Sequence, residues 1–180
     1  MFADYQPRAI GDDKEAPPAD LIIRHATHVD CSTIAALTAQ REGLSQDQAL
    51  QRATSALSKP TDTHLFLVAQ TQNHVIGFAK AAYIQFDPPV PQVPHGWYLT
   101  GIIVDPHHRR RGIGSALTNS RLQWIARHAS EVFYFANSLN RVSIELHQRL
   151  GFKEVFRDFK YPGTVFSGGG TGVLFRLKLE

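Results

Sequence analysis

The alternation of apolar and polar positions predicts strands and helices along most of the chain. Apolar, β-branched and aromatic runs predict strands over residues 21–24, 64–70, 75–86, 97–104, 132–136, 153–159 and 173–179. Apolar residues at helical spacing predict a helix over residues 113–126. Helices are also expected over residues 30–40, 45–57 and 140–150, the last of which ends before Gly151 as a natural C-cap. Ser45 and Gln48 form a capping box at the second helix, and Lys59-Pro60 ends it. Gln72-Asn73 is expected to join an antiparallel pair, with Gly77 as a candidate bulge.

Length and composition are typical of one compact domain. The 180 residues are 43% hydrophobic, enough for a full core, and we expect a single domain over residues 21–180. Residues 1–20 carry five acids, two bases and three prolines, which favours a flexible N-terminal arm or a segment that packs on a partner. The sequence has no apolar run of membrane-spanning length, and this N-terminus is too polar for a signal peptide. The single cysteine, Cys31, excludes a disulfide framework and favours the cytoplasm.

The stretch from Val104 to Leu117 joins the strand over 97–104 to a helix through a basic, glycine-containing turn. Gly112 and Gly114 let the backbone approach a ligand, and the first helical turn offers free N–H groups and the positive end of the helix dipole. Basic side chains are concentrated there: His107, His108, Arg109, Arg110 and Arg111. We therefore predict a pyrophosphate-binding turn. The alternative is an ordinary basic turn before an amphipathic helix.

The spacing of this turn narrows the class of phosphate ligand. A dinucleotide fingerprint requires a third glycine where Leu117 stands, and the Gly-Lys-Ser/Thr of a Walker A loop is absent. Arg109-x-x-Gly112-x-Gly114 instead resembles the acetyl-coenzyme A motif of the GNAT superfamily of N-acetyltransferases. A second stretch, from Asn140 to Gly151-Phe152, resembles that superfamily's Asn-x-x-Ala/Ser-x-x-Leu-Tyr/His-x-x-x-Gly-Phe signature.

The resemblance implies a fold and a cosubstrate. The expected class is α/β (α+β), with a mixed, mostly antiparallel sheet of about seven strands, flanked by about four helices and splayed at the acetyl-CoA site. The implied coenzyme contacts are the main chains of Ile102, Ile103 and Val104, the turn of Arg109, Arg110, Arg111, Gly112, Ile113, Gly114 and Ser115, and the side chains of Asn140 and His147. No metal is implied.

The chemistry that the resemblance implies is direct attack of an acceptor amine on the acetyl thioester within a ternary complex. His147 stands where the family often has tyrosine, and is either the acid for the leaving thiolate or a wall of the coenzyme channel. Tyr98-Leu99-Thr100-Gly101 resembles a Tyr-Leu-Glu-Gly segment, so Thr100 occupies the position of a catalytic glutamate. A threonine hydroxyl can order water but cannot act as a base near neutral pH. The base could then be a water chain, Asp87 or His95, or none is needed.

The acceptor pocket is expected between the proline-rich segment 86–96 and the glycine-rich segment 161–171. Its candidate residues are Asp87, Trp97, Tyr98, Thr100 and Phe166, with Asp158 as a weaker acid. The strand segment Tyr98-Leu99-Thr100-Gly101 and the closing stretch from Tyr161-Pro162-Gly163 to Phe175 resemble aminoglycoside-modifying members, including those that acetylate the 2′-amine of kasugamycin, which would give antibiotic resistance. Leu146-His147-x-x-Leu150-Gly151-Phe152 instead resembles phosphinothricin-type amino-acid acetyltransferases. A non-catalytic module that binds acyl-coenzyme A is the remaining alternative.

Other ligands and partners are less well supported by the sequence. Arg121 and Arg127 extend the basic surface, yet there is no nucleic-acid recognition motif. His25-x-x-His28 lacks a carboxylate partner at a metalloenzyme spacing. We therefore expect a small-molecule amine substrate, no nucleic acid and no membrane. A homodimer is the one assembly that stays open.

Overall fold

The computed structural model describes residues 16–166 and 168–179, which fold into two compact units. Within the described residues, the first unit contains residues 16–81 and 100–123, and the second contains residues 82–99 and 124–179 without 167. The strand order across the sheet is β1-β2-β3-β4-β5-β7-β6. Strands β3 and β4 and helix α3 each contribute residues to both units. In the described part of the chain, no helix is long and apolar enough to cross a membrane.

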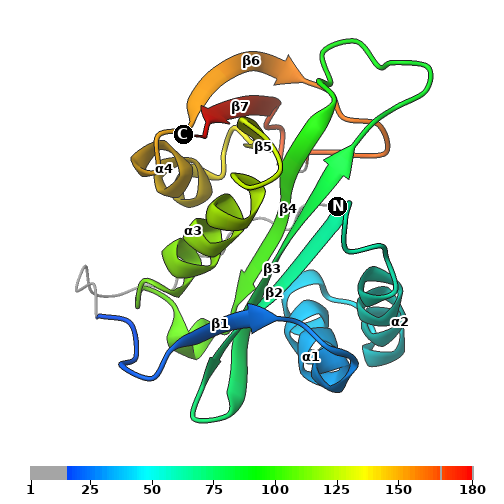
Figure 1. The fold of residues 1–180 in the computed structure, drawn as a ribbon. Coiled ribbons are helices and arrows are strands. Elements are labelled where there is room, and N and C mark those ends of the chain that lie inside the picture. The colour runs from blue at the N-terminus through cyan, green and yellow to red at the C-terminus, as the bar shows by residue number, and fades with distance from the viewer. Residues whose placement is uncertain (1–15, 167, 180) are drawn as a thin grey trace. The chain divides into compact units, whose positions relative to one another are not determined.

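The observed elements confirm the expected α/β class with a mixed, seven-stranded sheet (Figure 1). The strands are β1 Ile22–His25, β2 His64–Thr71, β3 His74–Ile84, β4 Gly96–Val104, β5 Glu131–Asn137, β6 Lys153–Phe159 and β7 Gly172–Lys178. The helices are α1 Cys31–Glu42, α2 Gln46–Leu57, α3 Ile113–Ile125 and α4 Arg141–Arg149. Two short 3-10 helices, His28–Asp30 and Pro106–His108, were not expected, because three residues are too few to show a periodic pattern.

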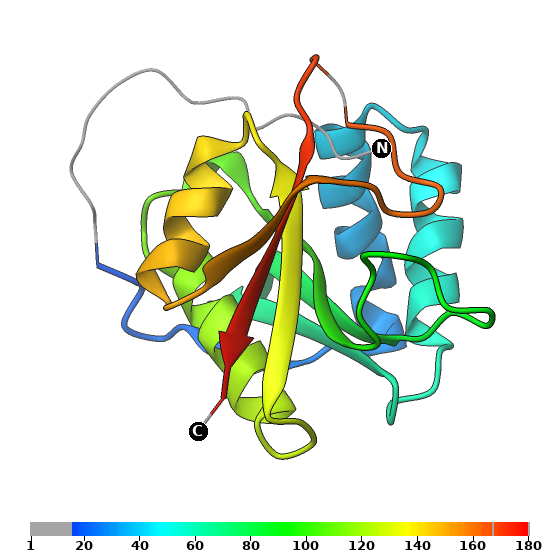
Figure 2. The ribbon, with the colours of Figure 1, turned by 90° about the horizontal axis from the view of Figure 1, so that it is seen from above.

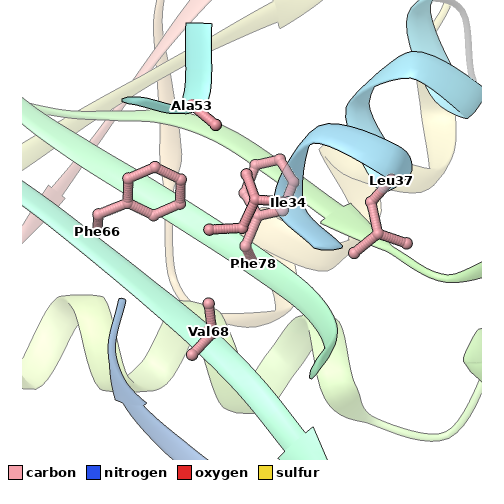
Figure 3. Packing of buried hydrophobic residues seen from close by; sticks show 6 residues of the cluster. All are labelled: Ile34, Leu37, Ala53, Phe66, Val68 and Phe78. Atoms are coloured by element: carbon pink, nitrogen blue, oxygen red, sulfur yellow. The ribbon is translucent and has the colours of Figure 1, made fainter. Parts of the chain in front are cut away.

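The core of the first unit lies between two helices and the strands they cover. Helices α1 and α2 run side by side (Figure 2). The buried side chains beneath them come from α1, α2, β2 and β3: Ile34, Leu37, Ala53, Phe66, Val68 and Phe78 (Figure 3). Gly43 ends α1 with a φ of +67°, and Ser45 caps α2 by accepting a hydrogen bond from Gln48 N at 3.2 Å. The expected capping box is therefore present.

A short connection joins β2 to β3. Gln72 and Asn73 both have positive φ values, 46° and 62°, as a tight two-residue hairpin requires. Asp20 holds this turn, because its carboxylate accepts hydrogen bonds from Thr71 Oγ1 at 2.6 Å and Gln72 N at 2.8 Å. Most of the expected N-terminal arm, residues 1–15, lies outside the described residues. The hydrogen bonds of Asp20 attach the end of this arm to the first unit.

The second unit is built on β5. Strand β5 runs parallel to β4 over Trp97–Leu99 and antiparallel to β7, and β6 pairs with the other edge of β7. Side chains alternate across β5. Phe133 and Phe135 join a buried cluster with Tyr98, whereas Tyr134 stacks on His147 of α4. The second unit therefore has an aromatic core on one face of β5 and α4 on the other.

Candidate active site

The turn before α3 has the geometry expected of an anion-binding site. Arg110 and Gly112 have φ values of 67° and 68°, and the first backbone hydrogen bond of α3 runs from Ala116 N to Gly112 O at 2.9 Å. The N–H groups before Ala116 are therefore not used by the helix ladder. A non-glycine residue such as Arg110 pays a conformational cost for a positive φ, and such residues concentrate at ligand sites. Gly112, which precedes the helix, has no side chain that could cap it.

The second half of β4 differs from its first half in burial. Trp97, Tyr98 and Leu99 are buried, whereas every residue from Thr100 to Val104 is only partly buried. The β4–β5 ladder ends with the pair Leu99 and Tyr134. Backbone groups of an apolar strand that are half-exposed can still bind a ligand. The predicted main-chain site at Ile102 to Val104 therefore lies in the accessible half of the strand.

Two contacts shape this half of β4. A Cβ on Gly77 of β3 would come within 2.9 Å of Ile103 O, so the strands approach closely here and only glycine fits without a shift. Arg109 Nε donates to Val104 O at 3.1 Å. The Arg109 guanidinium therefore stabilises the end of β4. Its contact with a coenzyme phosphate stays a prediction.

A buried arginine links α3 to the strands of the first unit. Arg121, 1% exposed, donates from Nη1 to Lys80 O at 2.9 Å and to Gly101 O at 3.4 Å. Its Nη2 donates to Thr118 Oγ1 at 2.9 Å, and Thr118 Oγ1 donates to Gly114 O at 2.8 Å. From the sequence alone, Arg121 is assigned to the basic surface. That assignment is wrong, because the side chain is buried and directed at backbone carbonyls.

Lys80 of β3 is, after Arg121, a second cation of the first unit whose side chain is at least partly buried. Its Nζ lies 5.9 Å from the centroid of the Phe66 ring, and its Cε would lie 3.4 Å from a Cβ on Gly101. Burial lowers the pKa of the Lys80 amine from its ordinary value, and the positive charges of Lys59 and Arg52 lower it further, against the opposing effect of Glu42. No pattern in the sequence singles out this position, because a single lysine in a strand is uninformative.

Asn140 begins α4 and caps it. Its Oδ1 accepts a hydrogen bond from Ser143 N at 3.3 Å, which makes it a standard N-cap. Since the cap uses the amide oxygen, the amide nitrogen is the atom that could donate to a ligand. The predicted coenzyme contact of Asn140 stays a prediction.

His147 lies in the interior of the second unit. It is 1% exposed, its ring stacks on Tyr134 at a centroid distance of 3.7 Å, and the ring of Phe152 meets it edge-on at 5.3 Å. Nδ1 lies 2.8 Å from Ser143 O. A carbonyl oxygen only accepts, so Nδ1 carries a proton, and Nε2 is the nitrogen that can gain or lose one. The Tyr134 hydroxyl is in turn hydrogen-bonded to Ser143 Oγ.

Most predicted acceptor contacts lie in the second unit. Tyr98 and Trp97 are 0% and 3% exposed. Burial and the neighbouring Tyr161 raise the pKa of Tyr98, whose hydroxyl donates to Pro94 O at 2.8 Å. Tyr98 and Phe166 belong to one aromatic cluster, whereas Trp97 packs against Trp124 and Tyr83. The structure thus brings Tyr98 and Phe166 together and separates Trp97 from them.

The three candidate polar groups outside these clusters are solvent-facing. Asp87, His95 and Asp158 are exposed. Thr100, in the first unit, is partly buried. Within the described ranges, 16–166 and 168–179, no group of three or more His, Cys, Asp or Glu residues could hold a metal ion.

Comparisons with known proteins show the family and the fold of the chain. Residues 22–152 match the model of the Acetyltransferase (GNAT) family. The chain belongs to this family. The GNAT family assignment covers both motifs and the elements between them, so acetyl-CoA is the cosubstrate and the chain is an N-acetyltransferase. No curated protein gave a significant match.

Solved GNAT-fold structures resemble the chain in fold at low sequence identity. Salmonella typhimurium yncA, solved with its cofactor acetyl-CoA, is 20% identical with a TM-score of 0.68, covering 90% of this chain and 95% of that one. An N-acetyltransferase from Staphylococcus aureus Mu50 is 19% identical, with a TM-score of 0.67 and coverage of 90% and 100%. The ribosomal-protein-alanine N-acetyltransferase from Brucella melitensis is 22% identical, with a TM-score of 0.67 and coverage of 88% and 99%.

Proposed function

We propose that this acetyltransferase transfers an acetyl group from acetyl-CoA to a primary amine of a small molecule, with an aminoglycoside such as kasugamycin as the first acceptor to test. The main support for coenzyme binding is the turn at Arg110 and Gly112, where two residues with positive φ values precede α3. The first N–H groups of α3 make no bonds within the helix and can bind phosphate. The two pyrophosphate charges of the coenzyme fit this turn.

Different residues of the chain have separate roles in the proposed reaction. Bound acetyl-CoA supplies the thioester that the amine attacks. The turn from Arg109 to Ser115 holds the pyrophosphate, and main-chain N–H groups between Ile102 and Val104 polarise the thioester carbonyl. His147 Nδ1 keeps its proton on Ser143 O, so Nε2 takes up a second proton from solvent and gives it to the departing thiolate. Thr100 orders the acceptor or a water molecule, and solvent accepts the amine proton.

The aminoglycoside proposal is supported by sequence resemblance and by accessible acids. Asp87 and Asp158 are both exposed, and a polycationic acceptor needs carboxylates to replace lost hydration. Acetylation of such an antibiotic would confer resistance. A reducing compartment, the cytoplasm, suits the single buried thiol of Cys31.

A second acceptor class, small amino acids of the phosphinothricin type, is favoured by Lys80. Its amine lies over the face of the Phe66 ring, 5.9 Å from the ring centroid. A partly buried cation beside Gly101 would be stabilised by a carboxylate on the acceptor.

One experiment separates these acceptors. Purified protein is incubated with acetyl-CoA and kasugamycin, other aminoglycosides, phosphinothricin or a peptide beginning with alanine, and the free thiol of coenzyme A is measured. The aminoglycoside proposal requires turnover with kasugamycin or a related aminosugar, and a lower kcat/KM in the Asp87→Asn, Asp158→Asn double variant. Turnover with phosphinothricin alone, lost in Lys80→Met, would replace it by the second class. If neither an aminoglycoside nor phosphinothricin causes thiol release, both acceptor classes are contradicted.

A further inference from the structure

The hydrogen bonds of Arg121 connect the two parts of the proposed coenzyme site that lie within the first unit. These parts are the β4 main chain after Gly101 and the turn before α3. Arg121 bonds Gly101 O, one residue before the β4 main-chain site, and Thr118 Oγ1, which bonds Gly114 O in the first turn of α3. Every link is an N–H or O–H donor aimed at an oxygen. The chain of bonds therefore runs from the accessible half of β4 to the pyrophosphate-binding turn.

Burying a guanidinium is an expensive way to pack a helix on a sheet. Removing an ion from water carries a large desolvation cost, and a hydrophobic residue of similar size would fill the same space at lower cost. Apolar contact is non-directional, however, and would let α3 slide along β4. Hydrogen bonds to the carbonyls of Lys80 and Gly101 instead fix the helix at one position along the strands.

We propose that Arg121 is a positioning residue: it sets the distance between the pyrophosphate-binding turn and the β4 main chain, so that a coenzyme held at the turn presents its thioester to the N–H groups after Gly101. The proposal rests on the proposed function. Arg121 lies seven residues beyond Gly114, about 10 Å along the helix axis. From there it reaches the strands without contacting the coenzyme phosphates.

The charge of Arg121 also acts on the peptide that follows Gly101. Its guanidinium draws electron density toward Gly101 O, and hydrogen bonds in series strengthen one another. The N–H of Ile102, in the same peptide group, becomes a stronger donor to the thioester carbonyl. Loss of the charge should therefore weaken carbonyl polarisation even where the helix stays in place.

Two pairs of variants test this role. Arg121→Met keeps the length of the side chain and removes the charge and the donors, whereas Arg121→Lys keeps the charge. Thr118→Val removes the middle link, whereas Thr118→Ser keeps the hydroxyl. Ile34→Ala, in the core beneath α1, is a stability control outside the network. Each protein is assayed well below its melting temperature for kcat, for coenzyme A affinity by calorimetry, and for the carbonyl stretch of bound 13C-labelled acetyl-CoA.

We expect Arg121→Met to lower kcat at least tenfold and to shift the carbonyl stretch toward its value in water, while coenzyme A affinity changes less than threefold. Thr118→Val should show part of the effect. Thr118→Ser and Ile34→Ala should keep the wild-type kcat and carbonyl stretch, and Arg121→Lys should keep them in part. A purely structural arginine would lower the melting temperature of Arg121→Met and leave kcat and the stretch unchanged, which would overturn the proposal.

The infrared measurement needs no acceptor, so the two proposals can fail separately. If the wild type binds acetyl-CoA but acetylates no amine, the proposed function fails, and the carbonyl stretch still decides the role of Arg121. If the wild type does not bind acetyl-CoA, both proposals are overturned.

Discussion

Helices α3 and α4 both follow a β-strand, but their first turns are built in opposite ways. Before α3 stand Arg110 and Gly112 with positive φ values and no capping side chain at Gly112. Before α4 stands Asn140, whose side chain accepts the N–H of Ser143. A capping side chain satisfies one of the free N–H groups of the first turn, whereas a glycine at that position leaves it for a ligand or water. Capping chemistry therefore distinguishes the two helices more clearly than the strand–helix pattern does, and it favours α3 for the proposed anion site.

The largest expected effect is at the uncapped turn. Gly114→Val places a β-branched side chain where the backbone must approach the pyrophosphate. We expect acetyl-CoA affinity to fall at least about 100-fold, the equivalent of about 3 kcal/mol, measured by calorimetry. Circular dichroism should show a folded protein. An affinity unchanged from wild type would remove the coenzyme from this turn.

The next effect concerns the side chain that α4 contributes. His147→Ala should lower kcat about ten- to a hundredfold, as for loss of one general acid, with little change in the KM for acetyl-CoA. Because His147 is buried against Tyr134, the variant will also lose stability, so His147→Phe is the matched control that keeps a ring. Wild-type kcat in both variants would make His147 a channel wall, and complete inactivity of both with normal coenzyme binding would make it essential.

Adding the same charge to both helix starts tests the comparison directly. A carboxylate in the first turn stabilises a helix by about 0.3–1 kcal/mol, but repels a bound pyrophosphate. Ser115→Asp in α3 should therefore weaken acetyl-CoA binding about tenfold while slightly raising the melting temperature. Val142→Asp in α4 should raise stability and change affinity less than twofold. Equal weakening by both would show that α4 also binds a coenzyme phosphate.

The smallest expected effects are at the cap of α4. Asn140→Ala should lower the free energy of unfolding by about 1 kcal/mol, as for other lost N-caps, measured by urea denaturation. Asn140→Asp keeps the oxygen that accepts from Ser143 N and loses the amide donor. It should keep stability and weaken acetyl-CoA binding about threefold if the amide nitrogen contacts the coenzyme. Unchanged affinity in Asn140→Asp would restrict Asn140 to capping.

Local signals in the sequence predicted the elements and the backbone conformation of the glycine-containing turn before α3. All seven strands and four helices were predicted to within two residues, because periodicity, capping boxes and glycine positions act over a few neighbouring residues. The same holds for Gly112, whose predicted freedom corresponds to a φ of +68°. The positive φ of Arg110 was not predictable, since arginine rarely adopts it.

The partners of individual side chains required the tertiary structure. Arg121 looked like a surface base, yet it bonds carbonyls 41 and 20 residues away. Tyr98 looked like an acceptor contact, yet it is fully buried beside Phe133. Such contacts depend on how distant segments pack, and hydrophobic periodicity along one segment contains no information about them. The sequence alone thus determined the elements, the family resemblance and the glycine-containing turn before α3, whereas only the packing of distant segments decided which charged and aromatic side chains are buried and what they bind.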